Sequence, residues 1–203
     1  MGTFTVIPQN TFNNMQLDAG VLLSTFNPAS PSVTDSNIIT ATTGGITVTC
    51  KPTFSDLGSD VDNVPNDMKE FKHLDFWDCS LSTTALGTSP AMIKKALGCA
   101  DIDGTDSTKI IPRATLSQSD FDSSIWWVGD KADGGFVAVE LKNALSTEGF
   151  TLKTTKNGKG QTSITIKGHV SLASQSVVPM VFYSANAPSS SNTNTGTGTG
   201  TGT

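Results

Sequence analysis

The stretch PTFSDLGSDVDNVPNDMKEFKHLDFWDCSLS, residues 52–82, contains a connection that is too long for an ordinary hairpin. An alternating apolar run that ends at Cys50 precedes it, and a second apolar run from Phe76 to Leu81 closes it. Strands that are neighbours in a compact domain are usually joined by about 2–5 residues. We therefore expect two early β-strands and, between them, a long loop with a task beyond reversing the chain.

Alternation of apolar and polar residues predicts β-structure in most of the chain. In GGITVTC, Ile46, Val48 and Cys50 alternate with threonines, as in a half-buried strand. The denser apolar run from Phe136 to Leu141 predicts a central strand. In SVVPMVFYS, residues 176–184, a proline indicates an edge strand or a bulge, because it cannot donate a ladder hydrogen bond.

The segment FTLKTTKNGKGQTSITIKGHVSL, residues 150–172, predicts a hairpin. Its Asn157-Gly158 pair suits a two-residue turn in which both positions need φ > 0. The alternation that follows places one set of residues on a common face: Ile164, Ile166, Gly168, Val170 and Leu172. The other face takes Thr165, Lys167, His169 and Ser171.

One short helix is expected in TSPAMIKKALG, residues 88–98. Ser89 is placed as the N-cap, Pro90 as the first helical residue and Gly98 as the residue after the helix. The fold class predicted is therefore mainly β: a β-sandwich or open barrel with one short flanking α-helix and a long loop between two early strands. Residues 1–184 form one domain, and residues 185–203 form a flexible tail rich in Ser, Asn, Thr and Gly.

Composition excludes several classes of protein. The chain has 13 Lys and Arg against 18 Asp and Glu, a net charge of −5, which argues against a surface that grips nucleic acid. Three cysteines without a CxxC spacing do not predict a disulfide framework and suit a reducing compartment. No apolar run approaches the length of a membrane span, and the first residues do not form a secretory signal.

The sequence contains no catalytic motif, so we expect neither an enzyme nor a cofactor. GxSxG, P-loop and HExxH patterns are absent, and a pairing of His73 with Cys79 has no third, orienting group. In DIDGTDS, residues 101–107, the glycine falls at the fourth position and no glutamate follows at the twelfth, so a solvated turn is expected and no metal site. Trp126 and Trp127 are adjacent, so in a strand at most one forms a sugar-stacking platform and the other packs in the core.

Five segments, taken in order, carry a family resemblance: MQLDAGVLLSTFNPAS (15–30), TTGGITVTC…DCSLS (42–82), AMIKKALGCADI (91–102), IIPR..L...DF (110–121) and IWWVGDKADGG…KGHVSL (125–172). In their order and number they resemble the tail tube (major tail) proteins of long-tailed bacteriophages, particularly those that infect Gram-positive bacteria. The resemblance covers most of residues 15–184 and leaves out the Gly-Thr tail.

The resemblance implies a structural virion protein without enzymatic activity. Hexameric rings of such proteins stack into a hollow tube through which DNA is delivered without sequence-specific binding. The partners implied are other copies of the chain, together with the tape measure, tail terminator and distal tail proteins. The location implied is the virion tail, made and assembled in the host cytoplasm, with no membrane, metal or cofactor.

In this family a long loop between two early strands reaches from one ring to the next, and residues 55–72 stand in that place. We expect the inter-ring contact to use nine residues: Asp56, Leu57, Asp60, Val61, Asp62, Val64, Asp67, Met68 and Phe71. The aspartates would set register against basic groups of a neighbour more than they would add affinity. The alternative for the same residues is a loop that packs on itself.

Two other functions remain open at this point. One is a carbohydrate-binding β-sandwich, and the other is a different virion part such as a capsid decoration protein. If the tube interpretation holds, a bore that DNA crosses quickly should be neutral to acidic, because lysines repeated along it would form a ladder of phosphate contacts. Lys167 opposes that expectation unless an acidic neighbour pairs with it.

Overall fold

The computed structural model of the chain describes residues 7, 8 and 10–187. Eight strands form one antiparallel sheet, and two more form a small second sheet. In spatial order the large sheet contains β1 (Gln16–Leu23), β6 (Asp122–Lys131), β7 (Phe136–Ser146), β9 (Gln161–Gly168), β3 (Lys72–Ala85) and β2 (Thr42–Asp56). β10 (Met180–Ala185) also pairs with β7, and β8 (Thr151–Lys153) also pairs with β9. The prediction of a mainly β fold is confirmed, and no closed barrel forms within the described residues.

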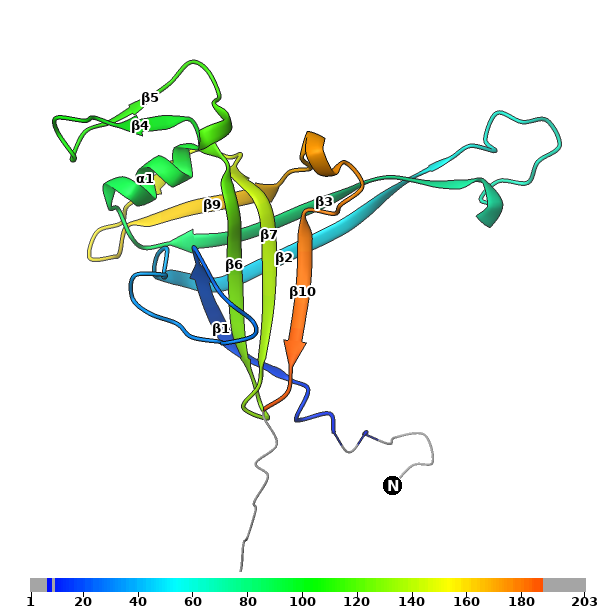
Figure 1. Cartoon of the computed structure of the whole chain (residues 1–203), viewed down its shortest axis with the longest axis horizontal. Helices are drawn as coiled ribbons and strands as arrows, with labels where there is room; N and C mark the ends of the chain where they lie inside the picture. Colours follow the sequence, from blue (N-terminus) through cyan, green and yellow to red (C-terminus); the bar gives the residue numbers. More distant parts are fainter. Residues whose placement is uncertain (1–6, 9, 188–203) are drawn as a thin grey trace, which may run out of the picture.

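The large sheet folds into two crossing layers because β7 changes partners along its length. Its first half pairs with β10, from Phe136 to Leu141, and its last residues, from Ala144 to Ser146, pair with β9. β6, β7 and β10 therefore run across β2, β3 and β9 (Figure 1). The prediction of a central strand starting at Phe136 is confirmed, because β7 has β6 on its other side.

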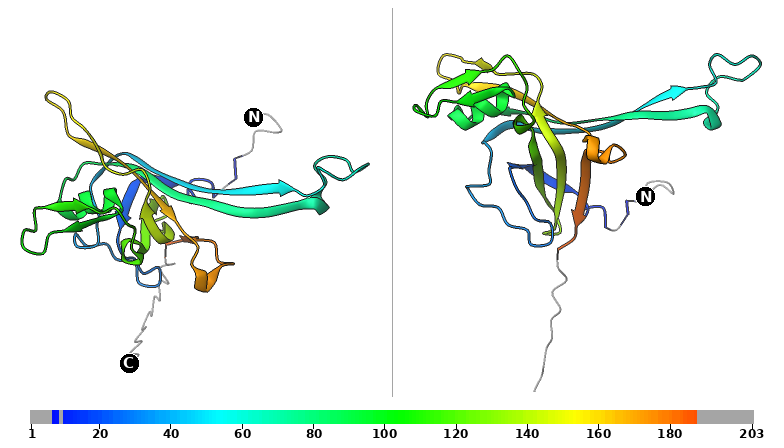
Figure 2. Two further views of the ribbon diagram at one scale, coloured as in Figure 1. Left: turned by 90° about the horizontal axis from the view of Figure 1, so that it is seen from above. Right: turned by 45° about the horizontal axis from the view of Figure 1, so that its top comes forward.

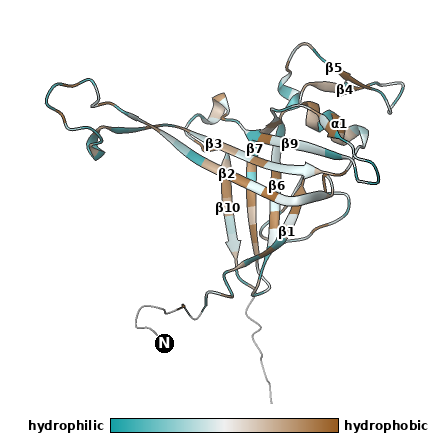
Figure 3. Ribbon diagram, turned by 180° about the vertical axis from the view of Figure 1, so that it is seen from behind, coloured by the Kyte–Doolittle hydropathy of each residue, from teal (hydrophilic) through white to brown (hydrophobic). Residues whose placement is uncertain are grey.

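The main core fills the space between the two layers. Leu22 of β1, Leu81 of β3, Ile125 of β6, Leu141 of β7 and Ile164 of β9 are all at most 1% exposed. Figure 3 shows hydrophobic segments along β6, β7 and β10. Each such aliphatic side chain contributes roughly 1.5–3 kcal/mol when it is removed from water, so the body of the molecule supplies its own stabilisation.

The two adjacent tryptophans enter two different clusters, as alternation along β6 requires. Trp127 packs in the main core, and its Nε1 donates to the carbonyl oxygen of Ala19 at 3.0 Å. Trp126 lies on the other side of the strand, with ring centroids 5.6 Å from Phe26 and 5.5 Å from Tyr183. Both indoles are buried.

A close approach at Gly20 locks β1 against β6. The register of β1 shifts between Leu17 and Val21, and Gly20 lies inside the shift with φ of 69°. A Cβ atom there would lie 2.4 Å from the carbonyl oxygen of Val128 and 2.6 Å from Nε1 of Trp127. Glycine is needed both for the left-handed backbone and for the space.

Helix α1 (Pro90–Leu97) has the predicted caps. The Ser89 hydroxyl accepts from the amide of Met92 at 3.3 Å, and Gly98 follows with φ of 74°. Met92 and Ala96 are buried, and the Ser146 hydroxyl on β7 donates to the Ala96 carbonyl at 2.8 Å. The helix lies beside the small sheet of β4 (Ala100–Ile102) and β5 (Ile110–Pro112) (Figure 1).

The predicted hairpin after residue 150 forms, but its turn is longer than two residues. β8 ends at Lys153 and β9 begins at Gln161, so residues 154–160 make the connection. Of the predicted pair, Asn157 alone has φ > 0, at 58°. The predicted alternation also stops early, because β9 ends at Gly168 and Leu172 starts a 3₁₀ turn (Leu172–Ser174) with 87% of its surface exposed.

The C-terminal strand begins directly after the proline. Pro179 directly precedes β10, which lies beside β7 alone, in agreement with the predicted edge position. Past Ala185, the Asn186 side-chain oxygen accepts from Nζ of Lys131 at 2.5 Å, so the body extends to this residue. The Gly-Thr repeats of the predicted tail lie outside the described residues.

Candidate functional site: the projecting arm

The β2–β3 ribbon extends past the rest of the sheet and forms a long projection. β3 pairs with β9 only from Ser80 to Ala85, whereas its pairing with β2 continues back to Lys72. Residues 53–76, here called the arm, therefore consist of two strands with no third neighbour, closed by a loop and the 3₁₀ turn η1 (Lys69–Phe71). Figures 1 and 2 show the arm leaving the body in one direction.

Large apolar side chains of the arm face water. Phe54 is 57% exposed and Phe76 58%, and Leu74 is also exposed. Phe54 is directly opposite Leu74, so these two side chains share one side of the ribbon. Phe76 is opposite Thr53, and because the register shifts between Thr53 and Phe54, Phe76 lies on the other side. Several large apolar groups exposed on one projection are typical of a surface that another molecule covers.

The loop at the end of the arm is ordered by one carboxylate. Asp56 accepts from the amide of Gly58 at 3.0 Å and from the amide of Asp67 at 2.9 Å. These two backbone hydrogen bonds, assisted by the nearby Lys72, lower the pKa of Asp56. Lys72 also pairs with Asp67, and the hydrogen bond to Asp67 is the main reason that the pKa of Lys72 is raised.

The nine residues expected to make the inter-ring contact fall into two groups. Asp56 and Asp67 are used within the loop, and Val64 and Phe71 close over Gly58, where a Cβ would lie 3.2 Å from each of them. The half-buried Met68 directly precedes η1. The remaining four side chains point to solvent: Leu57, Asp60, Val61 and Asp62. The loop thus packs partly on itself while standing away from the body.

Sequence reasoning missed the exposure of Phe76 on the stem of the arm. It placed Phe76 in one apolar run with Cys79 and Leu81, but the step from 76 to 79 is odd. In a strand an odd step changes the face, so Phe76 lies on the side opposite to Cys79, which is 1% exposed in the core. That parity break was the available signal.

A second surface continues from the arm along β2, β3 and β9. Residues that are directly opposite in an antiparallel pair share a face, and the register collects hydroxyl side chains on the face away from the core: Thr47, Thr49, Ser80, Ser82, Thr84, Ser163 and Thr165. We call this the hydroxyl face. Its charged members are Lys51, Asp78 and Lys167. Lys167 Nζ lies 3.1 Å from an oxygen of Asp78, so the acidic neighbour required by the sequence argument is present.

The groups considered for catalysis are not brought together. His73 is opposite Ser55 on the arm, whereas Cys79 is opposite Cys50, six residues further along β3 and roughly 20 Å away at 3.3 Å per residue. Burial is the main cause that raises the pKa of Cys79 to about 12, so it is a protonated thiol, 3.6 Å from the sulfur of Cys50. The ring of His169 packs edge-on against Phe121, and its Nδ1 is 3.1 Å from the carbonyl oxygen of Asn143.

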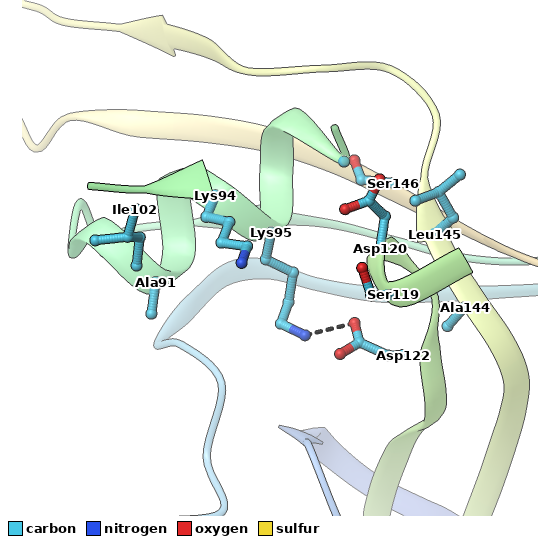
Figure 4. A pocket seen from close by; sticks show the side chains of 11 residues that line it. Ala91, Lys94, Lys95, Ile102, Ser119, Asp120, Asp122, Ala144, Leu145 and Ser146 are labelled. Carbon is cyan, nitrogen blue, oxygen red and sulfur yellow. Dashed lines mark hydrogen bonds and ion pairs between the residues drawn. The ribbon is translucent and has the colours of Figure 1, made fainter. Parts of the chain in front are cut away.

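A hollow of about 220 Å³ lies between α1, the 3₁₀ turn η2 (Gln118–Asp120) and β7. Figure 4 shows Lys95 reaching Asp122, with Nζ 2.5 Å from the carboxylate. Asp120 pairs with Arg113. The charged groups that line the hollow, except Lys94, are thus neutralised by partners in the described chain. The side chains that line the hollow include no thiol or imidazole.

The acidic turn after β4 is held by its own hydroxyl groups. Asp103 accepts from the side chain and the amide of Thr105, at 2.7 and 2.9 Å, and Asp106 accepts in the same way from Thr108. The Thr105 hydrogen bonds lower the pKa of Asp103 to about 2. No cluster of three or more His, Cys, Asp or Glu suited to a metal ion occurs in the part of the chain that the structure describes.

The tryptophan pair does not supply a sugar platform. The expectation allowed one of the two rings to be exposed, but Trp126 is 6% exposed and Trp127 9%. The reason is that β6 is covered on both sides, by the main core and by the Phe26 cluster. The observation on which the carbohydrate-binding alternative rested is therefore absent at these residues.

Comparison with known proteins adds no family at this point: neither a family model nor a curated sequence matches the chain. Within residues 7, 8 and 10–187, none of the helices is long and apolar enough to span a membrane.

Proposed function

We propose that this protein is the tail tube subunit of a long-tailed bacteriophage, which polymerises as stacked hexameric rings into the conduit for DNA delivery. One observation carries the proposal: a projecting arm on which the large apolar side chains of Phe54, Leu74 and Phe76 are exposed in the single chain. The resemblance in sequence order gives the proposal its specific form, and the arm gives it a physical basis.

The arm is suited to an interface that repeats without closing. A two-stranded ribbon alone is marginally stable in water, and this ribbon exposes several large apolar side chains. A surface that docks on a different surface of the next copy generates an open filament when the rotation between copies does not close into a ring. Axial stacking of rings is such a contact, and it would cover exposed apolar side chains of the arm.

Free sheet edges suit the lateral contact within a ring. β2, with fifteen residues, lies at one edge of the large sheet. β1 lies at the other edge, where Leu22 and Leu23 at its end are already bonded to Ile39 and Ile38. Unpaired edges invite pairing with another chain. In a ring the edges would meet a neighbouring copy, and the continuous inner wall of the tube would result.

We assign the hydroxyl face to the bore. It presents mainly serine and threonine, which DNA passes without the phosphate contacts that lysines make. Asp78 lies opposite Lys51 in the ladder and pairs with Lys167, so the face carries one net positive charge. The sequence predicted a neutral to acidic wall, so the net charge of this face is more positive than predicted.

The remaining parts of the proposal follow from the tube. The protein would be made and assembled in the host cytoplasm and would end in the virion tail, in contact with tape measure, terminator and distal tail proteins. It would need no cofactor and perform no covalent chemistry. We retain no sugar-binding or capsid-decoration function as a second proposal, because no observation on the described residues favours either.

Negative-stain electron microscopy of the purified protein at high concentration tests the proposal. We expect tubes of uniform diameter from the wild type. A variant in which residues 55–72 are replaced by a short glycine-containing turn should fold and form no tubes. A matched control shortens the exposed turn at residues 104–107, which stands on another part of the molecule. Normal tubes from the arm variant, or closed trimers from the wild type, would overturn the proposal.

A further inference from the structure

The tip of the arm and the β8–β9 hairpin lie at opposite ends of the molecule. β3 starts at the arm with Lys72 and ends at Ala85, which is directly opposite Thr162 of β9. Residues 151–161, here called the basic hairpin, therefore extend past the end of β3 that is remote from the arm. Figures 1 and 2 show the two projections pointing away from each other.

The two projections carry opposite charge. Residues 57–71 at the arm tip contain four acidic residues and one lysine, a net charge of −3. The basic hairpin contains three lysines and no acidic residue, a net charge of +3: Lys153, Lys156 and Lys159. The whole chain has a net charge of −5, so the cationic hairpin stands out from its background.

The charges most available to a partner are unpaired within the described chain. Asp60 and Asp62 are exposed and have no ion-pair partner there, unlike Asp56 and Asp67, which both pair with Lys72. None of the three hairpin lysines has an ion-pair partner in the same part of the chain. Each projection thus carries charged side chains that are available to pair with another molecule.

Apolar side chains accompany the charges on each projection. At the tip, Leu57 is 62% exposed and Val61 49%, and on the hairpin Leu152 is 43% exposed. Ion pairs between exposed groups are individually weak and fix register more than affinity. An apolar contact flanked by charge pairs, repeated around a ring, supplies affinity through multivalency.

We propose that the basic hairpin of one copy is the docking site for the arm tip of a second copy, in the axial contact between rings. This assignment rests on the proposed tube, and it names the surface that receives the arm. Leu57 and Val61 would cover Leu152, and Asp60 and Asp62 would face the three lysines. Because the two surfaces differ and lie at opposite ends, the contact repeats indefinitely.

A nucleic acid is the competing occupant of the hairpin. Three lysines are few for that task, since strong phosphate binding takes about six to ten contacts. We therefore assign the hairpin to the acidic tip of the same chain and make nucleic-acid binding an outcome of the test.

Charge-neutralised variants test the contact. The hairpin variant is K153Q/K156Q/K159Q, and the tip variant is D60N/D62N/E70Q. The tip variant includes Glu70 because it is the remaining exposed carboxylate of the tip that Lys72 does not contact; it pairs with its neighbour Lys69. Each should raise the protein concentration needed for tubes by about tenfold or more in low salt, and the effect should shrink as salt screens the charges. The matched control, K153E/K156E/K159E combined with D60K/D62K/E70K, keeps the net charge and should form tubes like the wild type.

Mixing the variants separates this inference from the proposed function. The hairpin variant retains an intact arm and the tip variant an intact hairpin, so sedimentation should detect complexes in the mixture that neither variant forms alone. Mixed complexes without wild-type tubes would support the contact and overturn the tube. Wild-type tubes with unaltered tubes from both variants would overturn the contact and leave the tube.

Two further measurements complete the test. Carbodiimide treatment of assembled wild-type protein should yield amide cross-links between tip carboxylates and hairpin lysines, read by peptide mass spectrometry; a reaction confined to other pairs would overturn the contact. Titration with duplex DNA at low salt should give the same weak binding for the wild type and the hairpin variant. A large loss of DNA affinity with unchanged tubes would assign the hairpin to nucleic acid instead.

Discussion

The β2–β3 ribbon runs through both the body and the arm, which are stabilised in different ways. In the body, β3 contributes Leu81 at 1% exposure, enclosed between two layers. In the arm, the same strand holds Phe76 at 58% exposure. The arm tip owes its order to the hydrogen bonds of Asp56 and not to packing on the body. The difference teaches that folding and assembly should be separable by mutation.

The largest expected effect is on the body. Leu141→Ala removes a side chain with no exposed surface from the centre of β7. Large-to-small changes at such positions cost about 2–5 kcal/mol through lost burial and the cavity that remains. Urea unfolding of the monomer measures the loss, and a cost below 1 kcal/mol would show that the two layers are not a packed core.

The second effect tests the close approach between β1 and β6. Gly20→Ala should cost about 1–3 kcal/mol, because the residue has a left-handed backbone and its Cβ meets the Val128 carbonyl. Gly44→Ala is the matched control, since Gly44 has φ of 78° but nothing within 4 Å of a Cβ. The difference in unfolding free energy between the two variants measures the cost of the close contact. Equal costs would show that the contact between Gly20 and Val128 does not limit the residue at position 20.

The third effect is local and depends on pH. The folded-state pKa of Asp56 lies below its ordinary value of 3.8, so its contribution to loop order is complete above pH 3.8 and is lost as the pH falls through the lowered pKa. NMR titration should show the Gly58 and Asp67 amides changing in that range while core amides of β7 stay fixed. In Asp56→Asn this pH dependence should vanish; if it persists, another group orders the loop.

The fourth prediction concerns exposed rings of the arm, whose removal should change stability little but abolish assembly. F54S/F76S should change the unfolding free energy of the monomer by about 0.5 kcal/mol or less, because both rings are largely exposed. The same variant should form no tubes in electron microscopy. Leu116→Ser, which alters a side chain 52% exposed on the body, is the control. A stability loss of several kcal/mol would mean that the arm packs on the body.

The smallest expected effect is that of the Gly-Thr tail. Its composition offers nothing to bury against the body, so it cannot offset the entropy of ordering. Truncation before residue 188 should leave the melting temperature unchanged in calorimetry. A fall of many degrees would show that the tail docks on the body, and the separation into body, arm and tail would need revision.

Local chemistry in the sequence was sufficient for the elements that depend on near neighbours. Ser89, Pro90 and Gly98 define the ends of α1 because caps act within one turn of the chain. A dense apolar run predicted β7, and alternation predicted β9, since side chains of a strand face opposite sides regardless of context. The long connection after residue 54 was also visible, as a length that no hairpin needs.

Contacts between distant residues were decided only by the tertiary structure. The pairing of Lys167 with Asp78, the burial of both tryptophans and the exposure of Phe76 each depend on which strands are neighbours and on where β9 ends beside β3. The same holds for the opposite placement of the acidic arm tip and the basic hairpin. The physical reason is that residue type and spacing set what a strand can present on each face, whereas the surroundings of that face are set by strand order, register and strand length in the folded sheet.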